Sequence, residues 1–172
     1  AAEARRARRA CRGGEAFDVQ STRGGPERAC GEEVAQRPEA AGAEKLPPAV
    51  KAMSSLGLFK DLDQAGLYIG FISGIIAANP ERADKLISDM FPLPPEDQVV
   101  IVRAIAYSGL RGWKELLQRF IERMPARKVL IDRYLHDKTK VLKELALDAG
   151  PPVLDANWGY YFATGSFEPV QR

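Results

Sequence analysis

Histidine and cysteine are almost absent from this sequence, which leaves little material for two common kinds of functional site. The 172 residues contain one histidine, His136, and two cysteines, Cys11 and Cys30. Two thiols without a nearby histidine or a second cysteine pair do not supply the four ligands of a structural zinc ion. No serine or cysteine stands in a nucleophile elbow, and no glycine-rich phosphate loop is present. We therefore expect neither a metal site nor a bound cofactor.

Long hydrophobic runs and a strong excess of one charge are also missing. The uncharged segment 65–78 has fourteen residues, whereas a helix that spans a bilayer needs about 20. No apolar stretch near the start resembles a signal peptide, so we expect a soluble, cytoplasmic protein without a transmembrane span. The 25 basic and 23 acidic side chains give a net charge of +2. This balance argues against a chain built to wrap nucleic acid.

The first 45 residues contain no leucine, isoleucine, methionine, tryptophan or tyrosine. So little apolar surface does not offset an ordering cost of about 1–2 kcal/mol per residue. We therefore predict that residues 1–45 form a disordered tail rich in alanine, arginine and glycine. Its first twelve residues carry a local net charge of +4. Three interpretations stay open: a basic arm for an anionic partner, a solvated tail without function, and a segment read from a misassigned start.

Proline and glycine punctuate residues 46–172, and the apolar residues between them recur at helical spacing. This pattern predicts an all-α domain of stacked antiparallel helical hairpins, either an irregular α-solenoid or a compact bundle. The expected helices cover about 49–56, 64–78, 80–91, 96–108, 111–124, 126–135, 138–149 and 153–163. Residues 99–102 suit a strand by residue type, but their flanking residues favour a helix. Residues 167–172 look like the opening of another helix, so we expect the natural domain to continue beyond Arg172.

Three glycines at a spacing of four, Gly66, Gly70 and Gly74, stand out in the segment 65–78. On a helix they form one smooth stripe along which another backbone can approach closely. Each glycine costs about 1 kcal/mol of helix propensity relative to alanine, so three of them indicate a packing role. We predict that this glycine stripe packs against a neighbouring helix. The alternative is that it mediates oligomerisation or association with a membrane surface.

The basic side chains cluster in the second half of the chain. Residues 111–143 have a local net charge of +6, whereas residues 46–98 have −3. This asymmetry can create a face for an anionic partner. The candidate patch consists of Arg119, Arg123, Arg127 and Lys128. The aromatic residues nearby lie on the apolar side of their helices and are poorly placed for base stacking, so a solvated face is the simpler interpretation.

Two isolated polar residues and one aromatic segment complete the candidates. Arg103 is the lone charge of an apolar run and could bind an anion, reach the surface or pair with an acid. His136 follows Asp132 by one helical turn and could be an oriented general base, although a histidine at a helix end is usually structural. At the C-terminal end, one predicted helix face carries four large side chains: Leu154, Trp158, Tyr161 and Phe162. One alternative is that this face forms a sugar-binding platform. We expect instead that it forms a hairpin core, with Tyr160 pointing away.

The segment from Leu154 to Gly165, with Trp158 and Phe162-Ala163-Thr164-Gly165, resembles the helix and turn of uncharacterised bacterial all-helical proteins. Those proteins repeat a Trp-x-x-x-Phe-x-x-Gly pattern at helix ends. The resemblance covers about a dozen residues closely and residues 60–172 loosely. It implies a bacterial helical protein without assigned activity, and it supplies no catalytic residues.

These observations favour a non-enzymatic helical scaffold or protein-interaction module with a protein partner. One alternative is a peripheral membrane or oligomerising protein that uses the helix of Gly66, Gly70 and Gly74. Another is a helical enzyme whose site lies partly in a C-terminal portion beyond this sequence.

Overall fold

The computed structural model describes residues 40–137 and 140–171, and within these ranges the chain contains helices and no strand. The all-α prediction is therefore confirmed. The α-helices are α2 (Leu46–Ser55), α3 (Gly66–Ala78), α4 (Ala83–Met90), α5 (Gln98–Tyr107), α6 (Trp113–Arg119), α7 (Lys128–His136) and α8 (Pro151–Thr164). Of the predicted disordered tail, residues 1–39, with Cys11 and Cys30, lie outside the described residues. Its last six residues form a 3-10 helix, η1 (Ala40–Lys45), so helical structure begins before the predicted boundary at Leu46.

Proline and glycine set the helix boundaries, as their backbone chemistry requires. Pro151 and Pro152 occupy the first turn of α8, where the missing N–H groups would have no helical partner in any case. The same helix ends at Gly165, which has φ 69° and donates its N–H to the Tyr161 carbonyl oxygen at 2.7 Å. Glycine adopts this left-handed conformation without steric cost. The predicted stop at Gly165 is confirmed.

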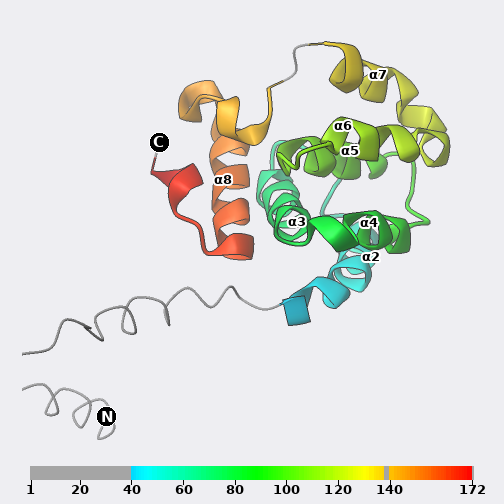
Figure 1. Cartoon of the computed structure of the whole chain (residues 1–172), viewed down its shortest axis with the longest axis horizontal. Coiled ribbons are helices and arrows are strands. Elements are labelled where there is room, and N and C mark those ends of the chain that lie inside the picture. Colours follow the sequence, from blue (N-terminus) through cyan, green and yellow to red (C-terminus); the bar gives the residue numbers. More distant parts are fainter. Residues whose placement is uncertain (1–39, 138–139, 172) are drawn as a thin grey trace, which may run out of the picture. The chain divides into compact units, whose positions relative to one another are not determined.

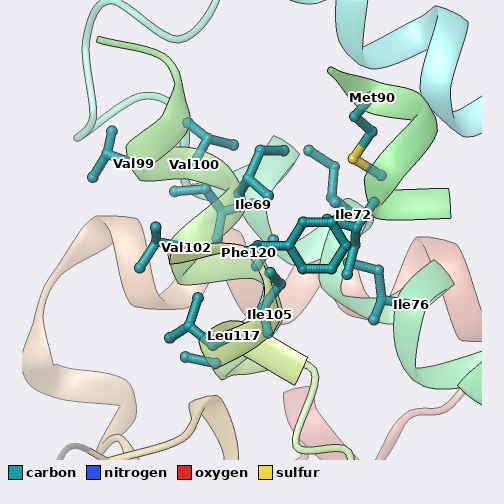
Figure 2. Packing of buried hydrophobic residues seen from close by; sticks show 14 of the residues in the cluster. Ile69, Ile72, Ile76, Met90, Val99, Val100, Val102, Ile105, Leu117 and Phe120 are labelled. Atoms are coloured by element: carbon teal, nitrogen blue, oxygen red, sulfur yellow. The ribbon is translucent and has the colours of Figure 1, made fainter. Parts of the chain in front are cut away.

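The main hydrophobic core lies around α3 and α5 (Figure 2). Ile69, Ile72 and Ile76 of α3 are buried, and they pack with Met90 of α4 and Leu117 of α6. Residues 99–102 belong to α5 and are all buried, so the helical prediction is confirmed and the strand alternative is wrong. Because α5 is covered by both α3 and α6, it has almost no polar face.

Two predicted helices are shorter or different in kind. The predicted helix 111–124 is interrupted at Phe120, because α6 ends at Arg119 and a 3-10 turn, η3 (Ile121–Arg123), follows. The predicted helix 138–149 is wrong over its described residues, which form two 3-10 turns, η5 (Leu142–Glu144) and η6 (Leu147–Ala149). Val141, Leu145 and Ala146 have extended backbone conformations, so the two turns do not join into one helix.

The inward face of α7 is narrow. Val129 is 76% exposed, whereas Ile131 and Tyr134 are buried. Val129 lies in the first turn of α7, and the buried pair is spaced by three residues farther along the helix. A short helix can bury only a narrow stripe, and here Ile131 and Tyr134 define it.

Candidate functional site

The glycine stripe of α3 lies against α8, and the two helices lie side by side (Figure 1). A Cβ atom added to Gly66 would lie 2.5 Å from the carbonyl oxygen of Pro152, and one added to Gly70 would lie 1.9 Å from that of Ala156. Real Cβ atoms essentially never come within 3.0 Å of such atoms. Residue numbers increase in the same direction along both helices, because Gly66 meets Pro152 and Gly70 meets Ala156. The two helices therefore run parallel, with backbone against backbone.

Small residues of α8 complete this contact from the other side. A Cβ added to Gly159 would lie 2.0 Å from the carbonyl oxygen of Leu67, and one added to Gly74 would lie 2.6 Å from the Cβ of Ala163. Neither Gly159 nor Ala163 was predicted from the sequence to be a packing residue. The signal was the spacing of Ala156, Gly159 and Ala163, which places small residues on one face of α8.

Close packing of the small residues turns the large side chains of α8 outward. Trp158 is 41% exposed and Phe162 is 63% exposed, whereas Tyr160 is only 9% exposed. The prediction that the face with Trp158 forms a core and that Tyr160 points away is therefore wrong. Large side chains would hold the α3 and α8 backbones apart, so the helix turns its small face inward. Tyr160 instead packs with Leu142 in a second, smaller core.

The outward residues form a continuous apolar surface, which we call the aromatic face. It comprises Leu154, Trp158, Tyr161 and Phe162 of α8, and Phe167. The Tyr161 ring centroid lies 4.5 Å from that of Phe167 and 5.9 Å from that of Trp158. Seven large apolar side chains are exposed among the described residues, and four of them belong to this face.

An open groove of about 780 Å³ lies beside the starts of α3 and α8. Three carboxylates line it, and no basic side chain does; the lining residues are Asp61, Asp63, Gln64, Leu67, Ala149, Gly150, Pro151, Pro152 and Asp155. Asp61 accepts a hydrogen bond from the Asp63 N–H at 3.0 Å. Within the described ranges, no three histidine, cysteine, aspartate or glutamate residues form a group that could hold a metal ion. We call this groove the acidic groove, and its lining residue Asp155 directly follows Leu154 of the aromatic face in α8.

The predicted basic patch makes contacts within the fold. Arg119 forms an ion pair with Asp84 of α4 at 2.7 Å. Arg123 donates a hydrogen bond to Ser88 of the same helix, and its guanidinium lies 5.5 Å from the centre of the Phe91 ring. These contacts join the α6 region to α4, so both arginines have a structural role.

The other two members of the patch are Arg127 and Lys128. Arg127 donates from Nε to the carbonyl oxygen of Pro95 at 2.9 Å, while Lys128 is exposed at the start of α7. Three of the four predicted residues thus contact residues 84–95. Binding of an anionic partner by this patch stays a prediction.

Arg103 is partly buried on α5 and hydrogen-bonds the phenol of Tyr134. Burial and the neighbouring Tyr107 together raise the pKa of Tyr134 to about 12, although Arg103 acts in the opposite direction. Arg103 and Tyr107 also line a cavity of about 30 Å³ between α5, α3 and α8. This volume is enough for about one or two water molecules. Arg103 therefore faces tyrosines and a small cavity.

His136 is exposed at the last residue of α7. None of the hydrogen bonds found among the described residues joins it to Asp132 or Asp137. The structure therefore does not assemble the acid–base pair that the sequence suggested at this position.

Comparisons with protein-family models, with curated proteins and with solved structures found no match to this chain. The resemblance to bacterial all-helical proteins therefore stays a prediction. In residues 40–137 and 140–171, no helix has both the length and the apolar character needed to cross a bilayer.

Proposed function

We propose that this chain is a non-enzymatic helical protein-interaction module and that the aromatic face is its docking surface. The observation that carries this proposal is the exposure of Trp158, Phe162 and Phe167 on and beside one helix. Aromatic side chains are enriched at protein interfaces and supply many binding hot spots. Isolated exposed apolar residues are ordinary, but contiguous apolar patches often mark interaction sites.

The size of the aromatic face suits a compact docking site. An aromatic side chain carries about 150–250 Å² of surface. With exposed fractions of 41%, 63% and 52%, Trp158, Phe162 and Phe167 together present about 300 Å². Leu154, one helical turn before Trp158, enlarges this patch. Its area lies within the range of about 300–600 Å² typical of the largest and often functional patches on single proteins.

The rigidity of α8 supports the same function. Gly70 and Gly159 bring the backbones of α3 and α8 into direct contact along the inner face, so α8 cannot rotate or shift without breaking that contact. A surface held in its binding conformation loses little conformational freedom when a partner binds. The aromatic face is therefore a preorganised surface.

A photo-reactive phenylalanine analogue at position 162 of the full chain tests this function in the native host. The matched control carries the analogue at position 129, because Val129 is 76% exposed but lies outside the aromatic face. We expect position 162 alone to cross-link a specific protein, which is then identified and purified. Phe162→Ser should weaken its binding by at least about tenfold, and Val129→Ser should not. Equal cross-linking at both positions, or unchanged binding by Phe162→Ser, would refute the proposal.

A further inference from the structure

We infer that the partner of the aromatic face is an amphipathic helical segment with basic residues at one end. Its apolar side packs on the aromatic face, and its basic end lies over the acidic groove. The inference rests on the proposed function and adds the chemistry of the partner. It follows from two features that the fold places next to each other, the aromatic face and the acidic groove. Asp155, which lines the groove, directly follows Leu154 in α8 and lies about one helical turn before Trp158.

The charged side chains that line the acidic groove all have one sign. Asp61, Asp63 and Asp155 line the groove, and no lysine or arginine lines it. The N-termini of α3 and α8 also lie there, and each adds a partial charge of about +0.5. The groove therefore keeps a net charge of about −2. A partner with basic side chains at this end gains electrostatic attraction, and one with acidic side chains is repelled.

The exposed residues of α8 determine the size of the partner. Leu154, Trp158 and Phe162 follow one another at intervals of four residues along one side of the helix. At a rise of 1.5 Å per residue, they span about 12 Å. A partner helix of about three turns covers this length with apolar residues at positions i, i+4 and i+7 or i+8, the pattern by which amphipathic helices dock on apolar surfaces.

The same charges argue against two other occupants. A second copy that bound through the same surface would bring another aromatic face with its own acidic groove, and this surface offers no basic group to Asp61 or Asp63. A membrane surface rich in anionic lipid would be repelled by the groove, because association with such lipids depends on basic residues around the apolar side chains. A basic amphipathic segment satisfies both the aromatic face and the groove.

Two synthetic peptides provide the test. Each is an amphipathic helix of about 16 residues with leucines on one side; one has three lysines at one end, and the other has three glutamates there. Fluorescence anisotropy measures the binding of each labelled peptide to the full chain. We expect the basic peptide to bind at least about tenfold more tightly at low salt, and the difference to shrink as salt screens the charges.

Three variants locate the binding. The double variant Asp61→Asn with Asp63→Asn should reduce the preference for the basic peptide by at least about threefold, because asparagine keeps the shape but removes the charge. Glu122→Gln, which neutralises an exposed carboxylate of η3, is the matched control and should leave the preference unchanged. Phe162→Ser should weaken both peptides by at least about tenfold.

The outcomes separate this inference from the proposed function. If both peptides bind equally and Phe162→Ser weakens both, the aromatic face is a docking surface but the basic partner is wrong. If neither peptide binds, or if Phe162→Ser has no effect, both proposals fail. Concentration-dependent dimerisation that Phe162→Ser abolishes would overturn the inference in favour of a second copy. Tighter binding to anionic than to neutral lipid vesicles, lost in the same variant, would overturn it in favour of a membrane surface.

Discussion

Replacing Gly70 by alanine tests the close packing of α3 and α8 most directly. The new Cβ would lie 1.9 Å from the carbonyl oxygen of Ala156 and 2.6 Å from its carbonyl carbon. Both are backbone atoms, so no flexible side chain can move aside. To restore a separation of at least 3.0 Å, the two helices must move apart by about 1 Å. A gap of this size forfeits about a quarter to a half of the dispersion energy between the facing atoms.

The expected loss of stability follows from two opposing effects. Overpacking a close-packed site costs about 1–3 kcal/mol, and a displaced backbone puts Gly70→Ala at the upper end of this range. Alanine recovers about 1 kcal/mol of helix propensity. The free energy of unfolding should therefore fall by about 2 kcal/mol, with Tm lower by about 6–10 °C. Urea and thermal unfolding followed by circular dichroism measure both quantities.

A control and a double variant make the test specific. Nothing lies within 4 Å of a Cβ at Gly42, so Gly42→Ala should change stability by no more than about 0.5 kcal/mol. A Cβ at Gly74 would lie 2.6 Å from that of Ala163. Gly74→Ala combined with Ala163→Gly should therefore be more stable than the two single changes predict, by at least about 0.5 kcal/mol. Wild-type stability of Gly70→Ala, or additivity of the second pair, would refute the direct contact of α3 and α8.

Three further predictions test the core, the surface and the alkaline range. Leu117→Ala, at a fully buried position, should lower the free energy of unfolding by about 2–5 kcal/mol. The control Leu56→Ala, at a position 75% exposed, should lower it by at most about 0.5 kcal/mol. Equal losses in urea unfolding would contradict the burial of Leu117. Arg119→Ala removes the half-exposed ion pair with Asp84 and should lower the free energy of unfolding by less than about 1 kcal/mol, with a smaller loss at high salt. A loss of stability that salt leaves unchanged would show that packing dominates. The free energy of unfolding should decline between pH 10 and pH 12, because the phenol of Tyr134 has a pKa near 10 in the unfolded chain but about 12 in the folded one. In urea titrations at several pH values, Tyr134→Phe should flatten this decline. An unchanged dependence on pH would speak against the raised pKa.

Local spacing in the sequence predicted the helices and several of their ends. Pro151 and Gly165 bound α8 as their backbone chemistry requires, and the apolar run 99–102 is helical because its neighbours extend it to the length of a helix. These features depend on residues close together in the chain. The fold class follows from such local signals.

The orientation of α8 could not be predicted in the same way. Spacing shows that Leu154, Trp158 and Phe162 share a face, but it does not show which face turns inward. That choice depends on Gly66, Gly70 and Gly74, which lie far away in the sequence and admit only a partner with small residues. The usual rule that large apolar side chains fill the core therefore gave the wrong face.

The acidic groove could not be predicted from the sequence, for a related reason. Its carboxylates come from two separate stretches, residues 61–63 before α3 and Asp155 within α8. They meet because α3 and α8 run parallel, which brings the starts of both helices to the same end. The charge balance of residues 46–98 gave an acidic excess, but only the pairing of the helices concentrates part of it in one place.

The parallel pairing of α3 and α8 also has a consequence for biosynthesis. When α3 leaves the ribosome, the helix that covers its glycines has not yet been made, because α8 is the last long helix in the described chain. Until then, the nascent protein exposes a smooth, uncharged ridge of backbone at α3. Contacts between distant parts of a chain form slowly, and incomplete folds with exposed apolar surface aggregate. The newborn polypeptide should thus be most dependent on chaperones in the interval before its C-terminal helix emerges.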